Sequence, residues 1–233
     1  MSETKNYCYQ YPRPAVTADC IIFGFDEGEL KVLLIERGIE PYKGKWAIPG
    51  GFIHNEESTE ECAKRELLEE TGLENVFMEQ LYTFSDYGRD PRGHVLTVAY
   101  YALVKLEDYH IHAGDDAKYA RWFAISQIPS LAFDHDRILR VALSRLRGKI
   151  RYQPIGFELL PEKFTLPELQ SLYETVLEVK IDRRNFRRKI NATGLLIDHQ
   201  ESVTGVPHVG ANYFSFDKKK YKELLERGFN FEI

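Results

Sequence analysis

Three glutamates in one segment have the spacing of a metal-binding surface. Glu66, Glu69 and Glu70 stand at positions i, i+3 and i+4, so on a helix their carboxylates share one face. Like charges placed in this way repel one another by roughly 0.2–0.5 kcal/mol per pair. A divalent cation such as Mg²⁺, which prefers carboxylate oxygens and substrate phosphates, offsets that repulsion. These residues alone leave a second interpretation open, an acidic helix face that only meets water.

The neighbouring residues fit the metal-binding interpretation. Arg65 can brace one of the carboxylates, and Glu57, one turn before the helix, can pair with Arg65. Gly50 and Gly51 let the backbone approach a ligand closely, because neither has a side chain.

The helix that carries the glutamates is predicted by signals at both of its ends. Residues 58–61, Ser-Thr-Glu-Glu, form a capping box that opens a helix, and Gly72 is a natural stop at its end. Four apolar residues supply one packed face: Cys62, Ala63, Leu67 and Leu68.

Strands and helices alternate through the first 150 residues, and this order predicts an α/β domain with a mixed sheet. The predicted strands are 16–25, 31–37, 76–86, 94–105 and 119–124. A second helix is predicted at about 136–147.

The segment from Gly51 to Leu73 resembles the Nudix box, G-x5-E-x7-R-E-U-x-E-E-x-G-U with U a bulky aliphatic residue, and every specified position is filled. The resemblance implies the Nudix α/β/α sandwich and hydrolysis, assisted by Mg²⁺ or Mn²⁺, of a nucleoside diphosphate linked to another group. The metal ligands that it implies are Glu66, Glu69, Glu70 and Gly51. The catalytic set that it implies consists of Glu66, Glu69, Glu70, Arg65 and Glu57. One glutamate, or a carboxylate outside the box, would take the proton from the attacking water.

Five residues outside the box are candidates for binding the substrate. Asp115 and Asp116 lie where family members often supply an extra carboxylate, although an acidic turn explains them as well. Arg89 and Arg92 supply two guanidiniums that can clamp phosphates. Their loop resembles one found in ADP-ribose-directed Nudix proteins, and an ordinary basic turn is the alternative. Trp46 is the fifth candidate, as a wall of the pocket.

The charge of the chain is divided unevenly. The total is 31 Lys+Arg against 36 Asp+Glu, a net charge of −5, which taken alone argues against a nucleic-acid partner. Residues 1–150 contain 18 basic and 24 acidic residues, whereas residues 151–233 contain 13 and 12. Six basic residues and one acid lie between Lys180 and Lys189. Glycines and prolines between Gly148 and Pro161 mark the junction of the two regions, which we call the seam. We therefore expect domains at 1–150 and 151–233.

The second region has the pattern of a small winged helix-turn-helix domain. The predicted elements are helices at 166–177 and 182–191, strands at 195–199 and 211–216, and a loop at 200–210. Phe186 and Ile190 would face inward and leave a basic outer face. The residues expected to contact DNA are Arg183, Arg184, Asn185, Arg187, Arg188 and Lys189. A solvated basic helix face is the alternative.

Nearly the whole chain resembles the Nudix-related transcriptional regulators of the NrtR type, with residues 164–173 and 184–187 carrying the match in the second region. In that family a Nudix domain senses a nucleotide or sugar, and a winged helix binds operator DNA as a dimer. The resemblance therefore implies a nucleotide-sugar ligand, double-stranded DNA and a homodimer. Because every box glutamate is present, hydrolysis of an ADP-ribose-like ligand is also expected.

We therefore expect a cytoplasmic, DNA-binding regulator. Two alternatives stay open: a stand-alone ADP-ribose or nucleoside-diphosphate-sugar pyrophosphatase whose tail does not bind DNA, and a catalytically silent sensor. No apolar run approaches the roughly 20 residues of a membrane helix, so no membrane partner is expected. The three cysteines are too few and too irregularly spaced for a disulfide framework.

Overall fold

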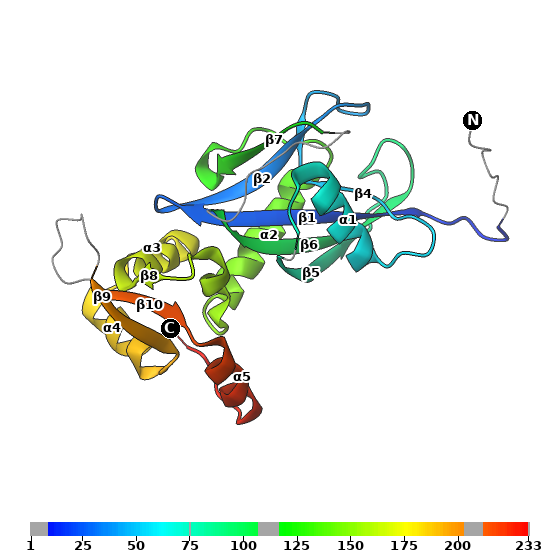
Figure 1. The fold of residues 1–233 in the computed structure, drawn as a ribbon. Helices are drawn as coiled ribbons and strands as arrows, with labels where there is room; N and C mark the ends of the chain where they lie inside the picture. Colours follow the sequence, from blue (N-terminus) through cyan, green and yellow to red (C-terminus); the bar gives the residue numbers. More distant parts are fainter. Residues whose placement is uncertain (1–8, 75, 107–116, 203–211, 233) are drawn as a thin grey trace.

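A mixed β-sheet with one helix on each face dominates the chain (Figure 1). The computed structural model describes residues 9–74, 76–106, 117–202 and 212–232. The strands of this sheet are β1 (Ala15–Asp26), β2 (Glu29–Arg37), β3 (Trp46–Ala47), β4 (Gly50–Phe52), β5 (Phe77–Phe84), β6 (Val95–Lys105) and β7 (Ala117–Ala124). The helices are α1 (Thr59–Thr71) and α2 (His135–Lys149).

Strand β1 is the centre of the sheet. The hydrogen-bonded order is β3-β2-β1-β6-β5, with β4 added on β1 and β7 on β2. Strands β1 and β6 run parallel and the other pairs are antiparallel, so the predicted mixed sheet is confirmed. Strands β1 and β2 form a hairpin whose turn residues Glu27 and Gly28 have φ values of 51° and 78°, a left-handed pair that suits a tight hairpin turn.

Alternate residues of β1 face opposite helices. Ile21 and Phe23 pack in a core with α2, whereas Cys20 and Ile22 pack in a core with α1. Successive side chains of a strand point to opposite faces of its sheet, and here both faces are covered, as in the α/β/α sandwich that the sequence predicted.

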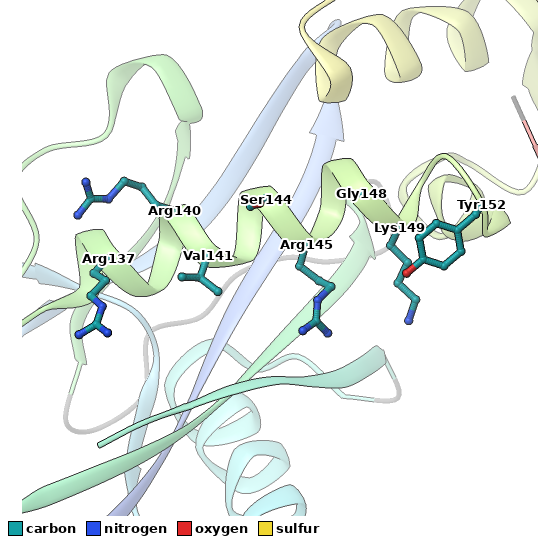
Figure 2. Close-up of a pocket in the computed structure, with 8 residues that line it drawn as sticks. All are labelled: Arg137, Arg140, Val141, Ser144, Arg145, Gly148, Lys149 and Tyr152. Carbon is teal, nitrogen blue, oxygen red and sulfur yellow. The ribbon is translucent and has the colours of Figure 1, made fainter. Parts of the chain in front are cut away.

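Helix α1 begins and ends at the predicted signals. The Ser58 side chain accepts a hydrogen bond from the Glu61 backbone N–H, the Glu61 carboxylate accepts one from the Ser58 backbone N–H, and Gly72 ends the helix with φ 75°. On the other face of the sheet, α2 buries apolar residues such as Ile138 and Ala142 together with Lys149, and its other basic side chains are exposed or partly exposed (Figure 2).

The C-terminal region forms a winged helix-turn-helix fold. Its elements are β8 (Phe164–Thr165), α3 (Leu166–Leu177), α4 (Arg183–Ala192), β9 (Leu196–Ser202), β10 (Asn212–Phe216) and α5 (Lys218–Glu226). Strands β8, β10 and β9 form a three-stranded sheet. A capping box between Thr165 and Glu168 opens α3. Both predicted helices and both predicted strands are present, and residues 203–210 of the predicted loop lie outside the described residues.

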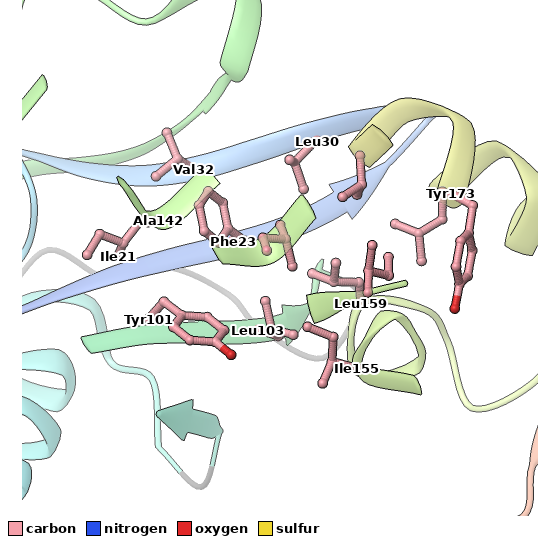
Figure 3. Close-up of a cluster of buried hydrophobic side chains, with 14 of the residues drawn as sticks. Ile21, Phe23, Leu30, Val32, Tyr101, Leu103, Ala142, Ile155, Leu159 and Tyr173 are labelled. Carbon is pink, nitrogen blue, oxygen red and sulfur yellow. The ribbon is translucent and has the colours of Figure 1, made fainter. Parts of the chain in front are cut away.

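One hydrophobic core joins the two regions (Figure 3). The predicted seam contains a short 3-10 helix, η3 (Pro154–Leu159), whose Ile155 and Leu159 are buried. They pack in the same cluster as Leu103 of β6 and Tyr173 of α3. The domain boundary near residue 150 stays a prediction, but the seam is a packed part of the core.

The sequence did not predict β3, β4, β8 or α5. The three strands have two or three residues each, too few for a periodic pattern, and they exist only because a neighbouring strand pairs with them. Among the described residues, no helix has both the length and the apolar character needed to cross a membrane.

The shared core predicts that both regions unfold together. Leu159→Ala should lower the free energy of unfolding by about 2–5 kcal/mol, because it leaves a cavity in place of a fully buried side chain. The fluorescence of Trp46 and Trp122 should follow the first region, and hydrogen exchange in α3 should follow the second. Both signals should shift by the same free energy.

The matched control is Leu225→Ala, at a residue 48% exposed, which should leave stability almost unchanged. Two separate transitions in wild type, or a shift confined to one region, would contradict a common core.

Candidate functional site

The acidic helix lies against two glycines of β4. Glu70 is only 8% exposed, and its carboxylate accepts a hydrogen bond of 2.8 Å from the backbone N–H of Gly50. The Glu66 carboxylate occupies the space beside Gly51, where an added Cβ would overlap it. Gly50 has φ 155°, and a Cβ there would collide with the Ala18 carbonyl oxygen. Both glycines are therefore required for the backbone to meet the two carboxylates.

Buried negative charge accumulates at this point. Burial raises the pKa of Glu70 to about 8, with a contribution from Glu66 and Asp19 and against the hydrogen bond from Gly50. Burial also raises the pKa of Glu66, which Arg65 opposes. Each carboxylate is thus destabilised in its charged form by burial and by a like charge nearby.

Arg65 organises the exposed side of the cluster. Its guanidinium donates to Glu57 at 2.7 and 3.1 Å, to Glu66 at 2.8 Å and to Glu69 at 3.1 Å. The hydrogen bond from Arg65 is the main reason that the pKa of Glu57 falls to about 2. The pairing of Glu57 with Arg65, expected from the sequence, is present.

The donor set fits a hard divalent cation. The buried carboxylate of Glu70 and the half-buried one of Glu66, both with raised pKa values, and a third, exposed one at Glu69 form a group that gains from a nearby positive charge. The Gly51 carbonyl lies opposite Ala18 in the pairing of β4 with β1 and also has a weak contact with the Cys62 thiol at 3.8 Å. In the described part of the chain, no three acidic, histidine or cysteine side chains are close enough together to hold a metal ion. Arg65 holds Glu66 and Glu69 toward itself.

A pocket rich in charge and aromatic rings adjoins the two glycines. It is lined by Asp19, Arg37, Gly50, Gly51, Phe52, Arg89, Asp90, Arg92, Phe133 and His135, among others. Strand pairing brings these residues together, since Asp19 of β1 lies opposite Gly50 of β4.

Both predicted phosphate-binding arginines already have carboxylate partners. Arg89 is 5% exposed and forms an ion pair of 2.6 Å with Asp134. Arg92 forms a paired hydrogen bond with Asp90 at 2.7 to 3.2 Å. The Arg92 guanidinium also lies 4.6 Å from the ring centre of Phe52. Arg89 therefore stabilises the wall of the pocket through Asp134, and Asp90 fixes Arg92 at the surface of the pocket.

Arg37 is a pocket residue that the sequence analysis missed. Its Nε donates to the Pro41 carbonyl at 2.8 Å, and its guanidinium lies 4.8 Å from the ring centre of Phe133. One terminal nitrogen, Nη2, is buried with no hydrogen-bond partner. Burial and the neighbouring Arg92 lower the Arg37 pKa. A buried donor without a partner is costly, and an anionic ligand would satisfy it.

Asp19 and His135 form the floor of the pocket, and the sequence analysis missed both. His135 Nδ1 accepts a hydrogen bond of 2.9 Å from the Ile48 N–H, and its Nε2 lies 3.8 Å from Asp19. Burial lowers the pKa of His135 to about 3, and Arg89 adds to this effect. Burial raises the pKa of Asp19 to about 7. The accepted hydrogen bond and the lowered pKa both favour neutral His135.

Three other predicted site residues are not found in this pocket. One lies elsewhere in the fold, and two lie outside the residues that the structure describes. Trp46 packs edge-on against Phe123, with ring centres 4.7 Å apart, and does not line the pocket. Asp115 and Asp116 lie outside the described residues.

Helix α4 presents a second candidate site. Its buried residues are Phe186 and Ile190, as predicted. Asp182 caps the helix by accepting from the Asn185 N–H at 2.8 Å. The basic residues that remain on its surface are Arg183, Arg184, Arg187, Arg188 and Lys189, of which Arg187 is half-buried. Within the described residues none of them forms an ion pair, and Arg188 donates to the Asn185 side chain at 2.7 Å.

Comparisons with known proteins assign both regions. A model of the Nudix domain matches residues 13–142, and a model of the NrtR DNA-binding winged helix domain matches residues 156–216. The chain is 38% identical over 196 residues to the ADPR responsive transcriptional repressor NtrR of Acinetobacter baylyi, covering 82% of this chain and 78% of that protein. It is 42% identical over 130 residues to the ADP-ribose pyrophosphatase of Methanocaldococcus jannaschii, covering 56% and 73%.

A solved structure has the same arrangement. Shewanella oneidensis NrtR in complex with a 27mer DNA matches with a TM-score of 0.76 at 36% identity, covering 86% of this chain and 93% of that chain. The NUDIX domain of that protein in complex with ADP ribose matches with a TM-score of 0.55 at 33% identity, covering 63% and 99%.

The buried histidine predicts a loss of stability in acid. Between its usual pKa of 6.5 and the folded value of about 3, the unfolded chain binds a proton that the folded chain does not. From this residue alone, the free energy of unfolding falls as pH drops from 6.5, by up to about 1.4 kcal/mol per pH unit. Asp19 and Glu70, whose pKa values are raised, contribute in the opposite direction over part of the same range. The contribution of His135 is therefore the difference between wild type and His135→Gln, which does not titrate and should lose less stability, or gain more, than wild type as pH falls. Urea unfolding of both proteins at a series of pH values measures it.

His54→Gln is the control, because the His54 side chain is 67% exposed and should leave the wild-type slope intact. An identical pH dependence of His135→Gln and wild type would show that His135 does not contribute.

Proposed function

Because the chain belongs to the Nudix family and carries the NrtR DNA-binding winged helix domain, we propose that it is an ADP-ribose-responsive transcriptional repressor. Its winged helix binds double-stranded DNA, and its Nudix domain binds ADP-ribose. The observation that carries the proposal is the presence in one chain of a complete acidic helix beside an arginine-rich pocket and of a separate helix with unpaired cations.

Helix α4 is the recognition helix of this proposal. Its residues Phe186 and Ile190 are anchored in the core, so the opposite face is held out rigidly toward a partner. The cations of that face contact phosphates or guanine edges, and Asn185 contacts a base edge. Strands β9 and β10 form the wing beside it. Since no carboxylate neutralises these cations among the described residues, the helix keeps its full attraction for DNA.

The arginine-rich pocket binds the ligand. ADP-ribose carries two phosphates, and the unsatisfied Nη2 of Arg37 supplies a donor for one of them. Arg92 is held ready by Asp90 beside two phenylalanine rings. We assign phosphate binding to Arg37 and Arg92, and give Arg89 the role of fixing Asp134 and Thr97.

Nudix enzymes use a divalent metal, and the acidic helix supports hydrolysis of the bound ligand. Glu66, Glu69, Glu70 and the Gly51 carbonyl would hold Mg²⁺ or Mn²⁺. When bound, the ion neutralises the diphosphate and lowers the pKa of the attacking water. The chain itself positions these groups, since Gly50 fixes Glu70 and Arg65 fixes Glu66 and Glu69. Asp115 or Asp116 remains a candidate proton acceptor.

Two further features belong to the proposal. The repressor is a homodimer, because a two-fold protein reads two half-sites about one helical turn apart. It acts in the compartment that contains the chromosome, which we take to be the cytoplasm. The rival function, a catalytically silent sensor, has the same pocket and differs only in turnover.

DNA binding is tested with a duplex selected from a random pool by the wild-type protein. Arg184→Ala should weaken binding to this duplex by roughly 5- to 150-fold, that is 1–3 kcal/mol, if it contacts a base edge. If it contacts a phosphate, the dependence of log K on log salt should fall by about 1. Fluorescence anisotropy at several salt concentrations measures both.

The control is Lys64→Ala, which removes the same charge from α1, where Lys64 pairs with Glu60. It should bind the duplex like wild type. Failure of wild type to enrich any duplex would refute the repressor function.

Ligand binding and turnover are separated by two variants. Arg37→Met should weaken ADP-ribose binding at least tenfold in calorimetry. Its melting temperature without ligand should change little, because the variant removes a costly buried donor without a partner together with the hydrogen bond to the Pro41 carbonyl. Glu70→Gln should reduce the Mg²⁺-dependent release of AMP and ribose phosphate by about 100-fold or more. The variant should still bind ADP-ribose, since the pocket arginines are unchanged.

Glu60→Gln changes the same charge on the solvent side of α1 and should keep full turnover. If wild type binds ADP-ribose but releases no AMP with Mg²⁺ or Mn²⁺, the silent-sensor function replaces hydrolysis.

A further inference from the structure

A basic groove runs along helix α2, apart from both sites described above. The helix contains five basic residues and a single acid, Asp136, among its 15 residues. The groove has a volume of about 540 Å³ and is open along its length. Four of its lining residues are the cations Arg137, Arg140, Arg145 and Lys149, and the other lining residues are uncharged.

Three of the four groove cations form a row on one side of the helix. In Figure 2, Arg137, Arg145 and Lys149 project toward the same side of α2, whereas Arg140 points in another direction near the start of the helix. Lys149, at the end of the row, is 8% exposed. Residues eight and four positions apart lie about 12 and 6 Å apart along a helix axis. The row thus presents positive charge along a line and not at one point.

Only part of this charge is neutralised by the protein itself. Lys149 pairs with Glu79 and Arg137 with Asp86. Within the described residues, neither Arg140 nor Arg145 has a carboxylate at ion-pair distance. Arg140 donates to the Asp136 backbone carbonyl, and Arg145 donates to the Leu81 carbonyl.

Helix stability does not explain these charges. Cations stabilise the last turn of a helix and destabilise the first turn, because the helix dipole is positive at the N-terminus. Arg137 lies in the first turn of α2 and Arg140 in the second. Their positions therefore have no benefit for the helix, whereas an anionic partner would benefit from them.

Gly148 is an independent sign of a partner that comes close. It is the second-to-last residue of α2 and lines the groove, and a Cβ added there would meet no atom within 4 Å. Its φ is not among the left-handed values, so neither packing nor backbone conformation requires glycine. Glycine is also a weaker helix former than alanine. Its presence is explained if a partner's atoms approach the backbone here.

We propose that the α2 groove is a second DNA contact, which binds the sugar–phosphate backbone of the duplex held by helix α4. This inference rests on the proposed repressor function. An open groove with a line of cations fits an extended polyanion, whereas a small ligand needs a pocket that encloses most of its surface. A row of arginine and lysine side chains binds the phosphate backbone without reading sequence.

The shared core makes the two contacts additive. Helix α2 packs into the same hydrophobic cluster as α3 and α4, and Arg147 of α2 donates to the Val176 carbonyl of α3 at 3.1 Å. Figure 1 shows α2 leading from the large sheet to the winged helix. Because the groove keeps a fixed position relative to α4, the second contact forms within an existing complex at a high effective concentration.

The test compares the selected duplex at two lengths. One probe contains the roughly 20 base pairs that two half-sites need, and the other extends it with arbitrary sequence to about 40 base pairs. Wild type should bind the longer probe more tightly and with a steeper salt dependence. Arg140→Glu should weaken binding to the longer probe by roughly tenfold and reduce its salt slope by about 1–2, with less than a twofold effect on the shorter probe.

Two further variants keep the result interpretable. Gly148→Ala should raise the melting temperature and still weaken binding to the longer probe, a combination that damage to the fold cannot produce. Lys64→Glu, the matched charge reversal on α1, should bind both probes like wild type.

Three outcomes would overturn the proposal. They are equal affinity of wild type for both lengths, an equal effect of Arg140→Glu on both lengths, and a change of oligomeric state of Arg140→Glu in sedimentation, which would assign the groove to an interface between copies. Absence of any selected duplex would instead overturn the repressor function itself.

Discussion

The burial of like charges at the meeting point of β1, β4 and α1 is the constraint on which the ligand site depends. Glu66, Glu70 and Asp19 all have raised pKa values for the same first cause, burial. A chain gains nothing in stability from such a group, because each charged form is unfavourable unless a cation or a donor is near. The glycines of β4 and the arginines around them are arranged to supply donors on one side and to leave the other side for a ligand.

Positive charge is placed differently from the buried carboxylates. The cations of α4 and most of those of the α2 groove lie at or near the surface, and several have no carboxylate partner among the described residues. The buried exception, Lys149, pairs with Glu79. The acidic residues of the first region thus do not neutralise the basic residues of the second, because the two sets point to different partners. A net charge of −5 is compatible with a DNA-binding protein for this reason.

Local signals allowed the sequence to predict a large part of the fold. The capping box at Ser58, the stop at Gly72 and the apolar spacing of α3 and α4 act over one or two helical turns, so the sequence alone reveals them. The i, i+3, i+4 spacing of the glutamates and the pairing of Glu57 with Arg65 belong to the same class. The roles assigned to these residues, and to Arg89, Arg92 and the α4 cations, remain predictions.

Long-range contacts explain what could not be predicted. Arg37, Asp19 and His135 meet only because β2, β1 and the start of α2 converge, and no spacing along the chain announces this. Arg89 was expected to face a phosphate, yet Asp134, distant in sequence, engages it. The glycines and prolines between residues 148 and 161 suggested a seam, but the apolar residues among them are buried in the core, which only the packed structure reveals.

The buried seam has a consequence for how sensitive the protein can be to its ligand. With a flexible linker between the two regions, the winged helix could reorient at almost no energetic cost. No threshold of ligand binding would then control its orientation. Here a change of orientation requires Ile155, Leu159 and Tyr173 to leave one packed arrangement for another, and packed cores have discrete arrangements and not a continuous range. The ligand concentration to which the protein responds is then set partly by packing at residues that touch neither ligand nor DNA. Substitutions in this cluster can therefore retune the threshold of response over generations while both binding surfaces stay unchanged.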